Sequence, residues 1–190
     1  MIDFLNDIEN CLEVLQQGGI FLYPTDTIWG IGCDATNSIA VTKIYQLKKR
    51  AEEKSMIILL ADEKDIIHYV TQPGFTVLEY LRHATKPTTV IYDGAMGLAE
   101  NVISKDGTVA IRITRDAFCK HLIKRYKKPI VSTSANISGY EAPAIFSAIS
   151  SEIKNGVEYI VQHRQDEVLP AVPSAIIRCN KDGTIAVIRP

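Results

Sequence analysis

Apolar positions near the start of the chain change from a helical to a continuous spacing. From Phe4 to Leu15 apolar side chains recur every three or four residues, as on one face of a helix. Gly18 and Gly19 follow, and glycine can end a helix because it accepts a positive φ. Residues 20–23 are then apolar throughout, which is typical of a strand buried on both faces. This part of the chain therefore predicts a helix followed by a buried strand.

The same alternation continues to the end of the chain. A second helix is predicted from an N-cap at Ser38 to the basic triplet at residues 48–50. Further helices are predicted over residues 62–70, 75–83, 116–126 and 144–154, and strands over residues 56–60, 89–92, 108–113, 130–132, 159–161, 175–178 and 185–188. Alternating strands and helices predict the α/β class, with a twisted sheet of parallel and antiparallel strands flanked by helices.

Length and composition limit the protein classes that fit this pattern. A chain of 190 residues suits one domain spanning residues 1–190. Lys+Arg 21 against Asp+Glu 22 gives a net charge of -1, which provides no global attraction for nucleic acid but leaves room for a local basic face. The acidic N-terminus is unlike a signal peptide, and no stretch approaches the roughly 18 apolar residues of a membrane helix, so we expect a cytoplasmic protein that needs no membrane.

The cysteines and one long loop complete this picture. Four cysteines, Cys11, Cys33, Cys119 and Cys179, lie far apart without a CxxC pair, which predicts buried free thiols and no metal site. Residues 163–173 contain two prolines and few apolar residues, so they are expected to form a loop. A loop of that length within a compact domain is more often functional than idle.

Three polar clusters follow predicted strands, where ligand sites form in α/β sheets. The first is Pro-Thr-Asp-Thr at residues 24–27 with Gly30 and Gly32, which either holds a small polar substrate or only turns the chain. The second is Lys48 with Arg50, which can clamp a polyphosphate or simply end a helix. The third, residues 132–139, reads Ser-Thr-Ser-Ala-Asn-Ile-Ser-Gly and can present donors to phosphate and ribose oxygens.

Common catalytic and nucleotide-binding motifs are absent from the sequence. It contains no GxxxxGK[ST] phosphate loop and no GxGxxG after a strand. It also lacks the GxSxG elbow of serine hydrolases, and none of its four histidines has a telling context. If the chain binds a nucleotide, it uses a less common arrangement.

In this order, the clusters resemble the YrdC family, the threonylcarbamoyl-AMP synthases. The matching blocks are GGIFLYPTDTIWGIGCDA at residues 18–35, KIYQLKKR at 43–50, TVAIRI at 108–113 and KPIVSTSANISG at 128–139, and the resemblance runs from Gly18 to Arg189. It implies a YrdC-like fold with a concave groove, in the family's short single-domain form. It also implies an enzyme that joins L-threonine, bicarbonate and ATP, with Mg²⁺ from solution, into threonylcarbamoyl-adenylate and pyrophosphate. Separate proteins would then transfer the threonylcarbamoyl group to tRNA.

The resemblance also implies roles for individual residues. The positions where the family holds threonine are matched here by Thr27, Arg112, Ser132 and Ser174. Those where it holds ATP are matched by Lys48, Arg50, Thr108, Ser134, Asn136 and Arg189. The carbamate formed from threonine can itself attack the α-phosphorus, so no protein nucleophile is needed. Lys48 and Arg50 are therefore expected to be the catalytic residues, because they can neutralise charge on the leaving pyrophosphate.

Some positions depart from the family pattern and keep two alternatives open. Leu59 stands where some members have a histidine that helps to hold threonine, Thr85-Lys86 interrupts a Pro-Gly-Pro turn, and Trp29 replaces a common tyrosine. One alternative is a YciO-like member that acts on a related adenylate. The other is a double-stranded RNA-binding module, in which residues 48–50 and 124–128 would supply phosphate contacts to RNA such as tRNA.

Overall fold

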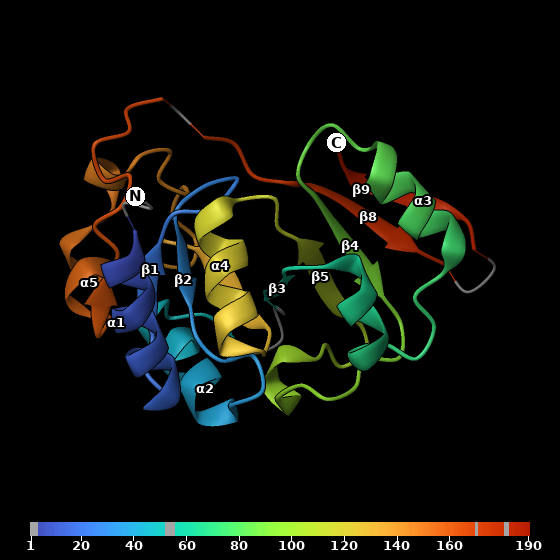
Figure 1. Cartoon of the computed structure of the whole chain (residues 1–190), viewed down its shortest axis with the longest axis horizontal. Helices are drawn as coiled ribbons and strands as arrows, with labels where there is room; N and C mark the ends of the chain where they lie inside the picture. Colours follow the sequence, from blue (N-terminus) through green and yellow to red (C-terminus); the bar gives the residue numbers. More distant parts are fainter. Residues whose placement is uncertain (1–3, 52–55, 170, 181–182) are drawn as a thin grey trace.

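The computed structural model describes residues 4–51, 56–169, 171–180 and 183–190 (Figure 1). Within these residues one mixed sheet has the strand order β7-β1-β2-β6-β3-β5-β4-β8-β9. The pairs β1–β7, β3–β5 and β4–β8 are parallel, and the other neighbours are antiparallel. The strands are β1 (Phe21–Tyr23), β2 (Gly30–Gly32), β3 (Ile57–Leu60), β4 (Thr88–Tyr92), β5 (Val109–Ile113), β6 (Ile130–Ser134), β7 (Tyr159–Ile160), β8 (Ala175–Cys179) and β9 (Ile185–Arg189). The predicted mixed α/β sheet is confirmed.

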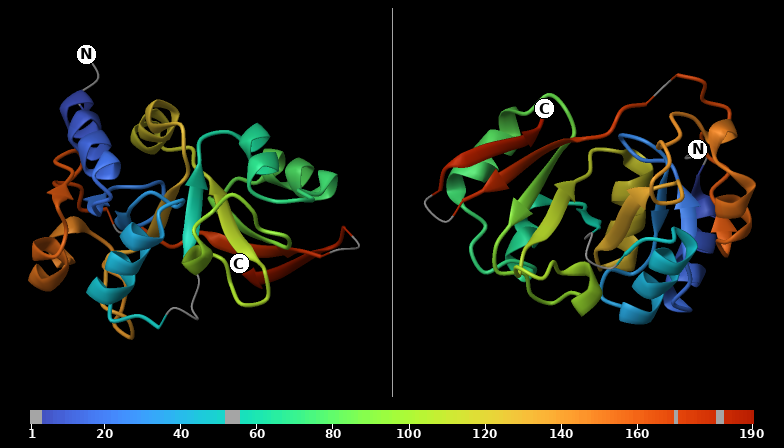
Figure 2. Two further views of the ribbon diagram at one scale, coloured as in Figure 1. Left: turned by 90° about the horizontal axis from the view of Figure 1, so that it is seen from below. Right: turned by 180° about the vertical axis from the view of Figure 1, so that it is seen from behind.

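Helices lie on both faces of the sheet but cover it unequally. The α-helices are α1 (Leu5–Gln16), α2 (Ser38–Leu47), α3 (Phe75–His83), α4 (Ala117–Tyr126) and α5 (Ser151–Asn155), and the 3₁₀ helices are η1 (Glu63–His68), η2 (Glu100–Val102) and η3 (Phe146–Ala148). On one face lie α1, α3 and α4, whereas α2 and α5 lie on the other, near the β7 end (Figure 2). Among the described residues, no helix covers the centre of this second face.

Alternation along the central strands explains the difference between the two faces. Ile58, Ile111 and Val131 are at most 1% exposed and point to the face that α4 covers. Because successive side chains on a strand point to opposite faces, their neighbours point the other way. Register then places Arg112 opposite Thr89 on β4, and places Ile57 opposite Ser132 on β6, so this second face carries polar groups.

The structure corrects several predicted boundaries. The strand β2, Gly-Ile-Gly, was missed because glycine is a poor strand former. Its glycines are required by packing, since a Cβ on Gly32 would lie 2.7 Å from the Tyr23 ring. Asn37, not Ser38, caps α2, and its Oδ1 accepts from the backbone N–H groups of Ile39 and Ala40.

The predicted helix over residues 144–154 is instead a 3₁₀ turn followed by the short helix α5. Ser150 has an extended backbone between the two, and its hydroxyl caps α5 by accepting from Ile153 N–H. The segment predicted as a helix over residues 62–70 is the 3₁₀ helix η1.

The prediction of buried free thiols is confirmed, because all four cysteines are free and buried. Among the described residues, none of the helices has the length and apolar character needed to span a bilayer.

Candidate functional site

A cavity of about 370 Å³ lies on the sheet face opposite α4. Its polar side chains come from the turn after β1, from Arg50 shortly after α2, from strands β4, β5, β6 and β9, and from Ser174 just before β8. These polar residues are Thr27, Arg50, Thr89, Arg112, Ser132, Thr133, Ser134, Ser174 and Arg189. Among the described residues, the charged lining consists of three arginines without any carboxylate. The cavity is therefore suited to anionic ligands that also offer hydroxyl or carbonyl groups.

The turn between β1 and β2 is ordered by the hydroxyl of Thr25. This hydroxyl donates to Ile28 O at 2.8 Å and accepts from Thr27 N–H at 3.0 Å. The Thr25 and Thr27 hydroxyls are 2.9 Å apart. Both side chains are buried, but Thr27 reaches the cavity wall and Thr25 stays behind it. The Pro-Thr-Asp-Thr cluster thus turns the chain and also presents one hydroxyl to the cavity.

Arg112 forms the buried end of the cavity. It is only 3% exposed, and its Nη2 lies 3.2 Å from Asp26 Oδ1 and 3.5 Å from Thr25 Oγ1. Asp26 is in turn fixed by the backbone N–H of Arg115, which donates to its Oδ2 at 3.1 Å. The Nε of Arg112 is buried without a hydrogen-bond partner among the described residues. The guanidinium is therefore held from one side while one of its donors remains available to an anion.

Hydroxyls surround Arg112 along the central strands. Ser132 and Ser134 line the cavity from β6, and Gly30 faces them from β2. A Cβ on Gly30 would lie 3.3 Å from Ser132 Oγ, closer than most such contacts, so glycine keeps space beside that hydroxyl. The serine-rich segment predicted as a ligand site therefore contributes its strand residues to the cavity.

Ser174, Arg189 and Thr89 form a linked group beside Arg112, because Thr89 is the strand partner of Arg112. The Ser174 and Thr89 hydroxyls are 2.8 Å apart, and Arg189 donates to Ser174 O from Nε at 3.0 Å and from Nη2 at 2.7 Å. The sequence did not single out Thr89 as a site residue. It reaches the cavity because it is the strand partner of Arg112, and that pairing was visible only in the register.

Lys48 and Arg50 both follow the last residue of α2, but their side chains lie in different environments. Lys49 between them adopts φ +49°, the left-handed conformation that often follows a helix. Arg50 lines the cavity, and partial burial lowers the pKa of its guanidinium. Lys49 points to solvent and pairs with Glu152 at 2.8 Å. The basic triplet therefore sends its three side chains to three different environments.

Lys48 lies beneath the loop after β6 rather than at the cavity wall. It is 1% exposed, and its ammonium donates to the backbone carbonyls of Ser134 and Asn136, the latter at 2.6 Å. Burial, with a smaller effect of the Arg50 charge, lowers the pKa of Lys48 from 10.5 to about 7. In this arrangement the ammonium of Lys48 donates to backbone carbonyls, and its side chain does not line the cavity.

Two other predicted ATP ligands also lie away from the cavity wall. Asn136 uses its Nδ2 to donate to Ile137 O and Tyr140 O, so its amide braces its own loop. Thr108 precedes β5 and donates its hydroxyl to Asp106 Oδ1 at 2.7 Å, which makes it part of a turn. The seven other predicted site residues, Thr27, Arg50, Arg112, Ser132, Ser134, Ser174 and Arg189, come together around one cavity.

The departures from the family pattern have unequal structural consequences. Leu59 is fully buried and is the strand partner of Arg112, so an apolar side chain occupies the position beside the guanidinium. Trp29 lines the cavity, and its ring lies 4.8 Å from that of Phe146. Thr85 and Lys86 line a separate groove between α3 and the β8–β9 hairpin. Of these departures, Trp29 is the one that lines the cavity among the described residues.

Comparison with known proteins agrees with this geometry. A family model for Sua5, YciO and YrdC proteins, described as "Telomere recombination", matches residues 13–190. The threonylcarbamoyl-AMP synthase of Idiomarina loihiensis is 30% identical over 75% of this chain and 78% of its own length. The enzyme of that name from Saccharophagus degradans is 34% identical over 71% of both chains.

Solved structures share the fold at low sequence identity. P. abyssi Sua5 complexed with L-threonine has a TM-score of 0.86 and 22% identity, and the match covers 96% of this chain. The chain spans about half of that longer protein, 53% of its length. E. coli YciO has a TM-score of 0.82 and 20% identity, and the match covers 97% of this chain and 88% of YciO. At these identities the likeness establishes the fold alone.

Proposed function

Because the chain belongs to the Sua5/YciO/YrdC family, we propose that it is a threonylcarbamoyl-AMP synthase that makes the adenylate and pyrophosphate from L-threonine, bicarbonate and ATP. The observation that carries the proposal is the lining of the cavity. Arg50, Arg112 and Arg189 face it together with serine and threonine hydroxyls, and no carboxylate lines it among the described residues. ATP and L-threonine both fit this lining, since the first is a triphosphate and the second a hydroxylated carboxylate.

The amino-acid end of the reaction is assigned to the buried wall. Arg112 offers its planar fork to the threonine carboxylate, which also meets the otherwise unpartnered Nε. Thr27, Ser132 and Ser174 supply hydroxyls within the same wall for the remaining polar groups of the substrate.

The ATP end is assigned to Arg50, Ser134 and Arg189, which line the cavity. A carbamate oxygen attacks the α-phosphorus while the bond from that phosphorus to the pyrophosphate oxygen breaks. Negative charge then grows on the leaving group, and Arg50 is placed to stabilise it. Mg²⁺ enters bound to the ATP phosphates, because the described lining offers no carboxylate ligand for it. Lys48, Asn136 and Thr108 support this end by fixing loops.

The wider role follows from the product. A mixed anhydride of a carbamate and AMP is an activated acyl donor, so a separate transfer protein must accept the threonylcarbamoyl group. We place the chain in the cytoplasm, upstream of threonylcarbamoyladenosine formation on tRNA.

The direct test is to incubate the chain with ATP, Mg²⁺, bicarbonate and one amino acid at a time. We expect pyrophosphate release and an adenylate mass that require both threonine and bicarbonate. Arg50→Ala should lower the rate about 10²-fold, because it removes one cation from the transition state. Arg125→Ala is a matched control, since Arg125 is exposed and pairs with Glu9 away from the cavity. Nucleotide binding without any adenylate product would instead favour a YciO-like enzyme that acts on a related adenylate.

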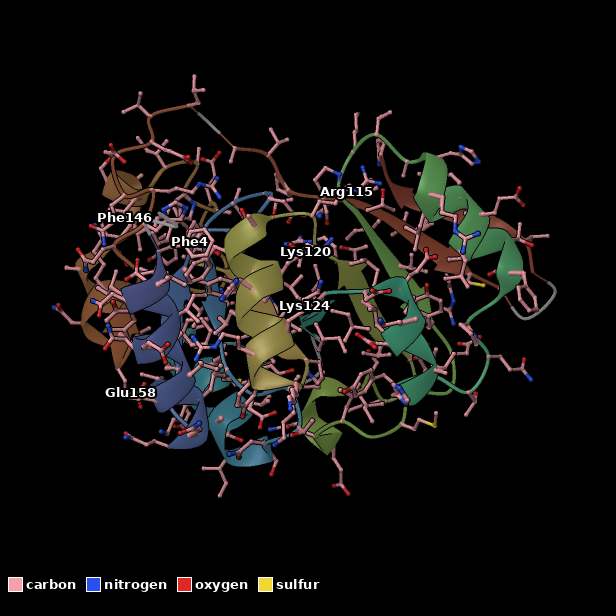
Figure 3. All side chains as sticks on the ribbon, in the orientation of Figure 1. Phe4, Arg115, Lys120, Lys124, Phe146 and Glu158 are labelled. Carbon is pink, nitrogen blue, oxygen red and sulfur yellow. The ribbon has the colours of Figure 1, made fainter. Side chains whose placement is uncertain are left out.

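A second function, RNA binding, rests on the exposed side of α4 and its end. Lys120, Lys124 and Lys127 have no ion-pair partner among the described residues, and Lys120 and Lys124 project from α4 on the face opposite the cavity (Figure 3). Lys128 is partly neutralised by Asp34 at 2.9 Å. Because Lys48 and Lys49 are engaged elsewhere, residues 48–50 add little to this surface.

Salt dependence measures this second function. If the three free lysines contact phosphates of double-stranded RNA, log Kobs should fall with log salt with a slope of roughly -2 to -3. Lys124→Gln should reduce the size of the slope by about 1 and leave adenylate synthesis unchanged. Failure to retain RNA even at low salt would eliminate this function.

A further inference from the structure

Arg164 has an unusual backbone conformation for its position. Its φ is +68°, in the left-handed region that favours glycine. Among the described residues, Lys49 and Lys127 are the other non-glycine residues with positive φ, and they end α2 and α4. A left-handed residue is ordinary at a helix end. Arg164 ends no helix, because it lies in the strap, which we define as residues 161–169 and 171–174 between β7 and β8.

The side chain of Arg164 joins three separate segments. Its Nη1 donates to Asp116 Oδ2 at 2.8 Å and to the backbone carbonyl of Thr25 at 3.3 Å. Its Nε donates to Glu167 Oε1 at 2.7 Å within the strap. Asp116 is itself fixed, since its other oxygen caps α4 by accepting from Cys119 N–H. Arg164 thus links the strap to the start of α4 and to the turn after β1.

The carbonyl that Arg164 holds belongs to the central residue of that turn. The Thr25 hydroxyl positions Thr27 through the latter's N–H and hydroxyl, and it also lies within 3.5 Å of Arg112 Nη2. Thr27 and Arg112 both line the cavity. A displacement of Thr25 would therefore move two groups at the amino-acid end of the site.

The chain just before Arg164 is held from another direction. The carboxylate of Asp7 on α1 accepts from the backbone N–H groups of Gln162 at 3.0 Å and His163 at 2.9 Å. It also accepts from Tyr159 OH at 2.5 Å. Strained backbone persists where its surroundings over-determine it, and such strain gathers at functional sites. Here the hydrogen bonds from residues 162 and 163 to Asp7 and the three contacts of Arg164 together maintain the left-handed conformation.

We propose that Arg164 is a positioning residue for the amino-acid end of the cavity: it holds the Thr25–Thr27 turn so that Thr27 and Arg112 keep one arrangement. The part of this inference that concerns threonine rests on the proposed function. The part that concerns the turn stands on the contacts alone. Glycine would occupy this position with less strain, and the three side-chain contacts explain why arginine stands there instead.

Arg164→Gly removes the side-chain contacts of Arg164 and also relieves the backbone strain at this position. Glycine accepts the backbone conformation, so the fold should remain, while the contacts to Thr25 and Asp116 are lost. In the free chain we expect the backbone amides of residues 25–28 to exchange with deuterium about tenfold faster. With substrates, KM for L-threonine should rise about tenfold, whereas KM for ATP should stay within twofold. Arg164→Lys should give a smaller rise, about threefold, since it keeps one cationic donor near Asp116.

Arg125→Ala is the matched control, because Arg125 is exposed and pairs with Glu9 away from the turn. It should leave the exchange and both KM values unchanged. Wild-type exchange at residues 25–28 in Arg164→Gly would overturn the proposal, and so would equal rises in KM for threonine and ATP. If the wild-type chain makes no adenylate, the proposed function fails, and the exchange measurement alone still decides whether Arg164 clamps the turn.

Discussion

Arg112→Ala is expected to lower kcat/KM for L-threonine about 10³-fold. Removing one partner of a buried, hydrogen-bonded charge pair costs roughly 2–5 kcal/mol. Here the pair is the threonine carboxylate and the guanidinium of Arg112, which is 3% exposed. Thr89, its strand partner on β4, offers a hydroxyl but no positive charge in its place. Calorimetric titration with threonine and steady-state kinetics would measure the loss in binding and in turnover separately.

The variant must be shown to keep its fold, because it also leaves Asp26 without its cationic partner. Asp26 retains the backbone N–H of Arg115, so the turn after β1 should survive with reduced stability. Arg115→Ala is the matched control. That arginine is exposed and donates to Leu81 O outside the cavity, so its removal should leave kcat/KM within about twofold. Unchanged threonine affinity in a folded Arg112→Ala variant would contradict the assignment of the carboxylate to Arg112.

The sequence predicted the elements of the fold better than the places of individual side chains. Helical and strand spacings predicted the mixed sheet, because buried faces of helices and strands repeat at different periods. They did not predict strand order, so the pairing of Thr89 with Arg112 and its place at the cavity remained hidden. The strand at Gly30–Gly32 was missed because it depends on packing against Tyr23, a contact that local strand propensity does not predict.

The Lys-x-Arg pair illustrates a limit of motif reasoning. Two cations one residue apart suggested a common target, yet the left-handed Lys49 sends Lys48 under the loop and Arg50 to the cavity. Asn136 and Thr108 were likewise assigned by their matched positions, and their side chains instead brace local turns. For Lys48 and Arg50 the backbone conformation at Lys49 separates the two side chains, and residue type alone does not encode it.

Lys48→Met should destabilise the protein by about 3 kcal/mol at pH 9. Methionine fills a similar volume but leaves the carbonyls of Ser134 and Asn136 without their donor, and each unpaired buried carbonyl costs about 1–3 kcal/mol. The cost should also depend on pH. Burial lowers the folded pKa of Lys48 to about 7 from 10.5, so between these values the unfolded chain binds more protons than the folded one. Raising the pH through this window therefore stabilises the wild type relative to the variant.

From pH 9 to pH 7 the advantage of the wild type over Lys48→Met should fall by about 2 kcal/mol, since each pH unit in this window is worth about 1.4 kcal/mol. Urea unfolding of both proteins at several pH values measures the difference between their free energies of unfolding. The titration of all other groups cancels in this difference, because both proteins contain them. Lys49→Met is the matched control, because Lys49 is exposed and should show no such trend. A neutral amine still has two N–H donors for the two backbone carbonyls, so loss of the charge does not release the loop. An advantage that stayed constant from pH 7 to pH 9 would mean that Lys48 keeps its charge when folded, and a permanent ammonium beneath the Ser134–Asn136 loop would then add to the positive potential that ATP meets at Arg50.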